Sequence, residues 1–175
     1  MSGNSWFSLL IFIAAFVIIF LISRKAGKNE HFDEMQLKVR GDAYKFSFFT
    51  VIILLAAVGL CYATGDFNIS DYISPDMILF SILYAGLLVF SVYSISKGAF
   101  FFVREKGNFY LAACFIVIVT NLPVLISRIV DGELIQNGSL SFNHGGANIL
   151  NIILFVTMIA VIIIKKAGCK KETTE

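Results

Sequence analysis

Four polar residues lie within or beside long apolar stretches, where side chains able to bind or react are rare: Asn121, Arg128, Asn148 and Asn151. Arg128 follows Asn121 at heptad spacing, so both side chains lie on one face of a helix. Asn148 and Asn151 begin the next apolar stretch, and we expect them at the same level as the first two. This cluster would either bind a small ligand or lipid, or join helices by hydrogen bonds while Arg128 reaches toward the headgroups.

A second group of polar residues lies in the stretch 29–45, the most polar part of the chain. Apolar residues recur at i, i+3 and i+7 from Phe32, which predicts a helix with a narrow apolar face. Glu34 precedes Lys38 by four residues, the favourable order for a helical ion pair. The stretch is either an amphipathic helix at the inner headgroups or a docking surface for a protein. The candidate docking residues are Asp33, Glu34, Gln36, Lys38 and Arg40.

The sequence predicts no enzymatic activity, no cofactor and no metal site. Asp33 and Glu34 are adjacent, so on a helix they point about 100° apart and make a poor acid–base pair. His31 has no partner at metal-ligand spacing, and the cysteines form no C-x-x-C pair. The sequence also contains no Gly-rich phosphate loop, H-E-x-x-H motif or nucleophile elbow.

The elements that must position these residues are apolar helices. The 175 residues are 58% hydrophobic and 15% charged, against about 45–50% and about 25% in soluble domains. Five apolar runs each approach the roughly 20 residues that a helix needs to cross the hydrocarbon core. We therefore predict an all-α integral membrane protein, one membrane domain over 1–175, with transmembrane helices at about 6–23, 46–64, 77–95, 109–130 and 149–164.

The distribution of basic residues predicts the orientation of these helices. All of the 14 Lys and Arg residues except Arg128 fall in the segments 24–45, 97–106 and 165–171. Cytoplasmic loops are the ones enriched in Lys and Arg, so we expect the N-terminus outside and the C-terminus inside the cell membrane. The segment 24–45 is then a cytoplasmic amphipathic linker, and 165–175 is a basic cytoplasmic tail. The predicted outer loops are 65–76 and 131–148, with glycosylation sequons at Asn68 and Asn137.

The interior of the predicted spans carries few ionisable groups. No Asp, Glu, Lys or His lies in the middle of a span, whereas proton relays and ion pathways depend on such groups. Gly59 with Ala63, and Ser81 with Ala85, have the spacing of helix-packing contacts. We expect both pairs to lie where helices of the bundle meet.

Two stretches resemble a group of known proteins. Residues 33–36 read Asp-Glu-Met-Gln, and residues 40–45 read Arg-Gly-Asp-Ala-Tyr-Lys. They look like the motif Asp-Glu-Arg-Gln, then Arg-Gly-x-Ala and an aromatic residue, of small uncharacterised multi-spanning membrane proteins of Gram-positive bacteria. Met35 replaces the arginine of that motif, and residues 92–101 are similar to a second shared stretch. The resemblance implies a bacterial cytoplasmic membrane; because the family has no assigned activity, it implies no function.

Three classes of function fit these observations. The first is a non-enzymatic subunit or regulator that contacts another protein through its spans or through the helix at 29–45. The second is a small channel or transporter, which would need several copies because one bundle offers little polar lining. The third is a membrane enzyme acting on lipid, which would need more inward-facing ionisable residues. The expected partners are the lipid bilayer and either another protein or further copies of this chain; nucleic acid is not expected, since no compact basic domain is present.

Overall fold

The computed structural model describes residues 32–64, 69–100, 108–136 and 138–172. The span predicted at 6–23, the first part of the predicted linker, and the residues Asn68 and Asn137 lie outside these ranges. The described ranges contain four helices that are long and apolar enough to cross a membrane. They correspond to the other four predicted spans, so the all-α class is confirmed apart from a short β-hairpin.

The four helices are α2 (Glu34–Thr64), α3 (Pro75–Lys97), α4 (Asn108–Val130) and α5 (Ala147–Glu172). The sequence of α3 explains both of its ends. Pro75 suits the first helical position because its ring fixes φ and it has no N–H to satisfy. Gly98, with φ 77°, ends the helix in the left-handed conformation. The N–H groups of Gly98 and Ala99 donate to the carbonyls of Ile95 and Ser94.

Two helices are longer than the predicted spans. The 31 residues of α2 extend about 46 Å at 1.5 Å per residue, whereas the hydrocarbon core is about 30 Å thick. Its polar first turns continue the apolar part along the same axis. The described part of the linker is therefore not a separate helix lying flat at the headgroups. Because α5 runs to Glu172, most of the predicted tail 165–175 is also helical.

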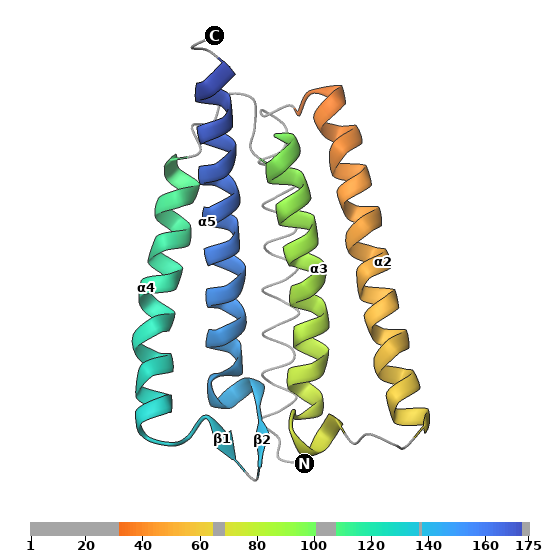
Figure 1. Ribbon diagram of the computed structural model, residues 1–175, viewed down its shortest axis with the longest axis vertical. Helices are drawn as coiled ribbons and strands as arrows, with labels where there is room; N and C mark the ends of the chain where they lie inside the picture. The colour runs from red at the N-terminus through yellow and green to blue at the C-terminus, as the bar shows by residue number, and fades with distance from the viewer. Residues whose placement is uncertain (1–31, 65–68, 101–107, 137, 173–175) are drawn as a thin grey trace, which may run out of the picture.

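The helices stand in a row in the order α2, α3, α5, α4 (Figure 1). One end of the row holds the starts of α2 and α4 and the ends of α3 and α5. We call it the basic end, because the Lys and Arg residues of the described ranges, Arg128 excepted, lie toward it. The opposite end, which carries the hairpin, is the hairpin end. Thus α2 and α4 run antiparallel to their neighbours, whereas α3 and α5 run parallel.

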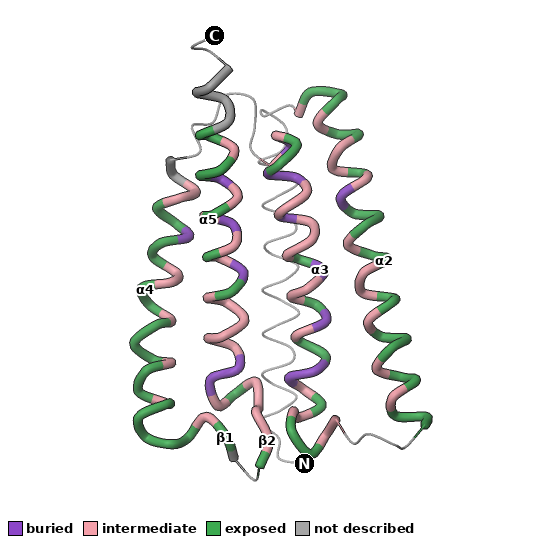
Figure 2. The backbone as a smooth tube through the Cα atoms, in the orientation of Figure 1, coloured by how far each residue is buried: buried purple, intermediate pink, exposed green. Residues whose placement is uncertain are grey.

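The buried core lies between α3, α5 and α4 (Figure 2). It is formed by Ile95, by Cys114, and by Leu154, Met158 and Ile162 on successive turns of α5. In contrast, α2 stands at the edge of the row, and Ala43 is its fully buried residue. Among the described helices, α2 packs against α3.

Between α2 and α3, the small residue at the close approach is Gly86, whereas the sequence analysis expected Gly59 at a helix contact. A Cβ added at Gly59 would meet no described atom within 4 Å, so the prediction that Gly59 packs against a helix is wrong within the described ranges. A Cβ at Gly86 would instead lie 2.6 Å from Val51 Cγ2. The Ser47 hydroxyl donates to the Gly86 carbonyl at 2.7 Å. The two helices can come close at Gly86 because glycine has no side chain, whereas a larger residue there would collide with Val51.

The two predicted outer loops join into one cap at the hairpin end. Strands β1 (Ile135–Gln136) and β2 (Ser139–Leu140) pair antiparallel. The Leu140 N–H donates to the Tyr72 carbonyl at 2.9 Å, and the Leu140 carbonyl accepts from the Ser74 N–H at 3.0 Å. A 3₁₀ turn, η1 (Ile69–Asp71), precedes α3, and a π-type turn, η2 (Phe142–Gly146), precedes α5.

Aromatic stacking and one carboxylate fix this cap on α3. The rings of Phe80 and Phe142 stack with centroids 3.9 Å apart. Asp76 accepts hydrogen bonds at 3.3 Å from the Ser141 hydroxyl and from the Phe142 N–H. The cap therefore connects the start of α3 with the turn that leads into α5.

Candidate functional site

Two of the four residues of the predicted polar cluster are in direct contact. Asn151 of α5 donates from Nδ2 to Asn121 Oδ1 of α4 at 3.2 Å. The Tyr84 hydroxyl of α3 donates to Asn151 Oδ1 at 2.7 Å. Asn121 Nδ2 in turn donates to the Val117 carbonyl of its own helix at 2.8 Å. Tyr84, Asn151 and Asn121 thus form a polar chain that connects three helices.

The residues of the polar chain lie well inside the apolar helices, away from the helix ends. Tyr84 and Asn121 are both nine residues from the hairpin-end termini of their helices, Pro75 and Val130, which is about 13 Å of helix. All three side chains of the chain are partly buried. In such surroundings an unpaired amide or hydroxyl is costly, so each group gains from a partner on the neighbouring helix.

The other two residues of the predicted cluster do not join this chain. Arg128 Nη1 lies 2.8 Å from Glu133 Oε2, and both side chains are substantially exposed. Among the described residues no hydrogen bond connects Asn148 to Asn121 or Asn151. The structure brings Asn121 and Asn151 of the predicted cluster together and adds Tyr84, which the sequence analysis did not place there. The position of Tyr84 in the sequence could have indicated its role, since it places a hydroxyl near the middle of an apolar run.

The candidate docking residues divide between two sides of α2. Gln36 Nε2 donates to the Gly98 carbonyl at 2.9 Å. The Arg40 guanidinium lies 4.2 Å from the Phe32 ring centroid and 5.9 Å from that of Phe90 on α3. Both residues therefore face α3, the side on which Ala43 and Ser47 follow along the helix.

The remaining candidate docking residues are exposed. Asp33, Glu34 and Lys38 turn away from α3, and the predicted ion pair between Glu34 and Lys38 is not among those formed by the described residues. The neighbouring side chains of Met35 and Leu37 are 73% and 55% exposed. We call these five residues, Asp33 to Met35 with Leu37 and Lys38, the free face of α2.

The end of α3 receives side chains from both flanking helices. Lys165 Nζ of α5 donates to the Ile95 carbonyl at 2.9 Å, and Gln36 of α2 donates to the Gly98 carbonyl. A cation is favourable at a helix C-terminus because the last carbonyls carry partial negative charge. A Cβ at Gly98 would lie 2.6 Å from Lys165 Nζ, so glycine leaves room for this contact.

The described residues contain no group of three or more His, Cys, Asp or Glu side chains that could hold a metal ion. Comparison with known proteins adds no relative: no family model, curated protein or solved structure matches the chain. The resemblance to multi-spanning proteins of Gram-positive bacteria therefore stays a prediction.

Proposed function

We propose that the protein is a non-enzymatic, multi-pass membrane subunit or regulator, and that it binds another protein through the free face of α2. The observation that carries this proposal is the division of the polar turns of α2 into two sides. One side is held on α3 by Gln36 and Arg40. The remaining positions present Met35 and Leu37, one on each flank of Gln36, next to exposed charges. Exposed apolar side chains beside exposed charges, on a helix fixed by its other side, are a combination found in protein-binding surfaces.

The use of the polar groups inside the row supports this proposal over a transport pathway. Tyr84 donates to Asn151, Asn151 donates to Asn121, and Asn121 donates to a backbone carbonyl of its own helix. Such bonds hold helices together in lipid, where the hydrophobic effect does not. A small oligomeric channel is the alternative, and it would require further copies to supply a polar lining.

We further propose that the span predicted at 6–23 adds a fifth transmembrane helix and that the basic end faces the cytoplasm of a bacterial cell. Apart from Arg128, the described Lys and Arg residues gather toward one end of the row, as the positive-inside rule requires. A single cysteine at Gln136, in a chain whose native cysteines are serine, should react with an impermeant maleimide on intact cells. A cysteine at Lys38 should react only after lysis, and the opposite pattern would overturn the orientation.

The binding proposal is tested by photo-crosslinking in native membranes. A photoreactive amino acid at Lys38 should capture one dominant foreign protein. The same amino acid at Ala43, a buried position about one and a half turns further along α2, is the matched control and should capture none. Leu37→Asp should reduce co-purification of that partner with the full chain about tenfold, which corresponds to about 1.4 kcal/mol of binding free energy.

Two outcomes would reject the binding proposal. Crosslinks from Lys38 that reach only further copies of this chain would favour a homo-oligomer, and channel assays in liposomes would follow. Equal capture from Lys38 and Ala43 would show that the captured protein does not recognise the free face.

A further inference from the structure

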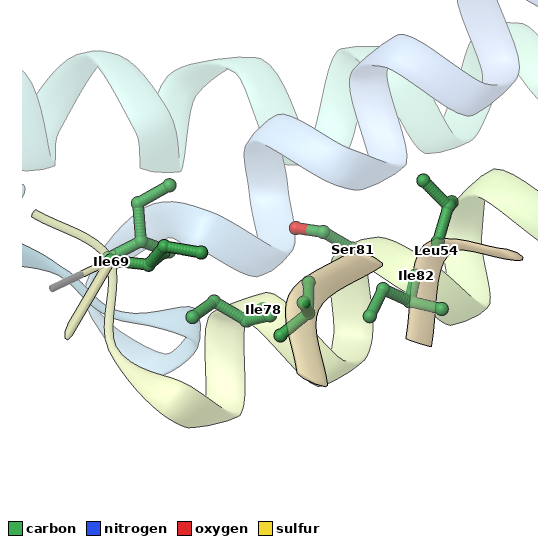
Figure 3. A pocket seen from close by; sticks show the side chains of 7 residues that line it. Leu54, Ile69, Ile78, Ser81 and Ile82 are labelled. Atoms are coloured by element: carbon green, nitrogen blue, oxygen red, sulfur yellow. The ribbon is translucent and has the colours of Figure 1, made fainter. Parts of the chain in front are cut away.

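An apolar space separates α2 from α3 toward the hairpin end. It consists of two adjoining cavities of about 250 Å³ and about 340 Å³, which share Val58 and Ile78 in their walls. Figure 3 shows Leu54 of α2, Ile69 of the loop, and Ile78 and Ile82 of α3 around the first of them. We call this space the α2–α3 wedge.

The ring contacts and the side-chain hydrogen bond between the described parts of α2 and α3 lie in the half nearer the basic end. There the ring centroids of Tyr44 and Phe90 lie 4.6 Å apart, and the Ser47 hydroxyl donates a hydrogen bond to the Gly86 carbonyl. Beyond this contact the two helices diverge toward the hairpin end (Figure 1). The cavities open in that part, between Leu54 and Tyr62 on α2.

The chemistry of the wedge fits a hydrocarbon chain with a polar end. No charged side chain lines either cavity. At the rim nearest the hairpin end, the hydroxyls of Tyr62 and Ser70 lie 3.0 Å apart. An acyl chain would meet walls that are apolar except at Ser81, and the ester region of the same lipid would lie at the level of these two hydroxyls.

We propose that the α2–α3 wedge binds one acyl chain of a bilayer lipid from the leaflet at the hairpin end. An apolar space many times the roughly 30 Å³ of a water molecule favours an apolar occupant. The wedge lies between two helices long and apolar enough to cross a membrane, and its lining is continuous with the exposed apolar surface at Leu79. This proposal rests on the membrane insertion of α2 and α3.

The test uses the full chain in phosphatidylcholine liposomes that contain a small fraction of a phosphatidylcholine with a diazirine on its acyl chain. After photolysis, labelled peptides are quantified by mass spectrometry. Labelling in the wedge, at Leu54, Val58 and Ile78, should exceed labelling on the exposed face of α4 about tenfold, which corresponds to about 1.4 kcal/mol of preference.

Filling the wedge gives the decisive comparison. Val58→Trp should abolish the excess labelling. Val124→Trp is the matched control: Val124 lies six residues from the hairpin-end terminus of α4, as Val58 does in α2, but it is exposed. It should leave the excess unchanged. If Val58→Trp inserts poorly, Leu54→Phe replaces it.

Several results would overturn the proposal. Equal labelling around the row, or excess labelling that survives Val58→Trp, would show that no chain is held. A disulfide between a cysteine at Val58 and one within 6–23, or between two copies at Val58, would show that protein fills the wedge. A protein extracted from the liposomes by alkaline carbonate would reject membrane insertion itself, which distinguishes that failure from loss of the lipid site alone.

Discussion

Replacement of Asn151 by leucine tests whether the polar chain holds three helices together. Leucine has a similar size but no polar atoms. The substitution removes the bond from the Tyr84 hydroxyl at 2.7 Å and the bond to Asn121 at 3.2 Å. Both bonds cross between helices, so one change weakens the contact of α5 with α3 and with α4. No other single substitution in the polar chain affects both contacts.

The expected loss follows from the number of bonds. Interhelical hydrogen bonds in membranes contribute about 0.6 kcal/mol on average and about 1.7 kcal/mol at most. Asn151→Leu should therefore lower the free energy of unfolding by about 1 kcal/mol, with an upper limit of about 3 kcal/mol. Tyr84→Phe removes one bond and should cost about 0.6 kcal/mol. In the Asn151→Leu background Tyr84→Phe should cost almost nothing, because its partner is already absent.

The measurement is unfolding of the full chain in mixed dodecylmaltoside and SDS micelles, followed by circular dichroism. Thr157→Val is the control on the same helix, because the Thr157 hydroxyl donates at 2.8 Å to the Ile153 carbonyl within α5 and forms no hydrogen bond to another described helix. It should change the free energy of unfolding by less than about 0.5 kcal/mol. An equal loss of unfolding free energy in Thr157→Val and Asn151→Leu would show that the polar chain does not hold the helices together. An equal loss from Tyr84→Phe with Asn151 and with leucine at that position would show the same.

Three further substitutions can be measured in the same micelle assay. Gly86→Ala would place a Cβ 2.6 Å from Val51 Cγ2; it should cost about 1–3 kcal/mol, and Val51→Ala should restore most of that loss. Gly98→Ala would place a Cβ 2.6 Å from Lys165 Nζ and would put a non-glycine residue at a φ of +77°. It should cost about 1–3 kcal/mol. Adding Lys165→Met should recover only part of that cost, because the backbone strain persists. Arg128→Ala breaks an exposed pair, so its effect should stay below about 1 kcal/mol, and a larger loss would mean that the arginine has another structural role.

The sequence predicted the four described spans because apolar run length fixes them. It also predicted where α3 starts and ends to within two residues, since Pro75 and Gly98 act through the local backbone. The start of α2 at Glu34 was harder to predict. Its polar turns contain no proline, so nothing local separates them from the span, and the alternative of a flat amphipathic helix was equally consistent with the pattern.

The lateral order of the helices could not be predicted from hydropathy. Each helix is apolar on several sides, so no single face identifies its neighbour. Small-residue spacing selected Gly59, yet the close approach is at Gly86. The difference is that the Gly86 carbonyl has a donor opposite it, the Ser47 hydroxyl, and such complementarity is visible only when two helices are placed together. The Asn121–Asn151 pair was predictable because both residues lie at a comparable depth.

Each contact between neighbouring helices in the row contains its own polar bond. Ser47 connects α2 with α3, Tyr84 connects α3 with α5, and Asn151 connects α5 with α4. In a bilayer, which is as apolar as leucine, such bonds would select one neighbour over another where hydrophobicity cannot. The polar residues within the row are thus used to define its order. This use leaves the free face of α2 as the described polar surface best placed to bind a protein outside the row, which is the basis of the proposed function.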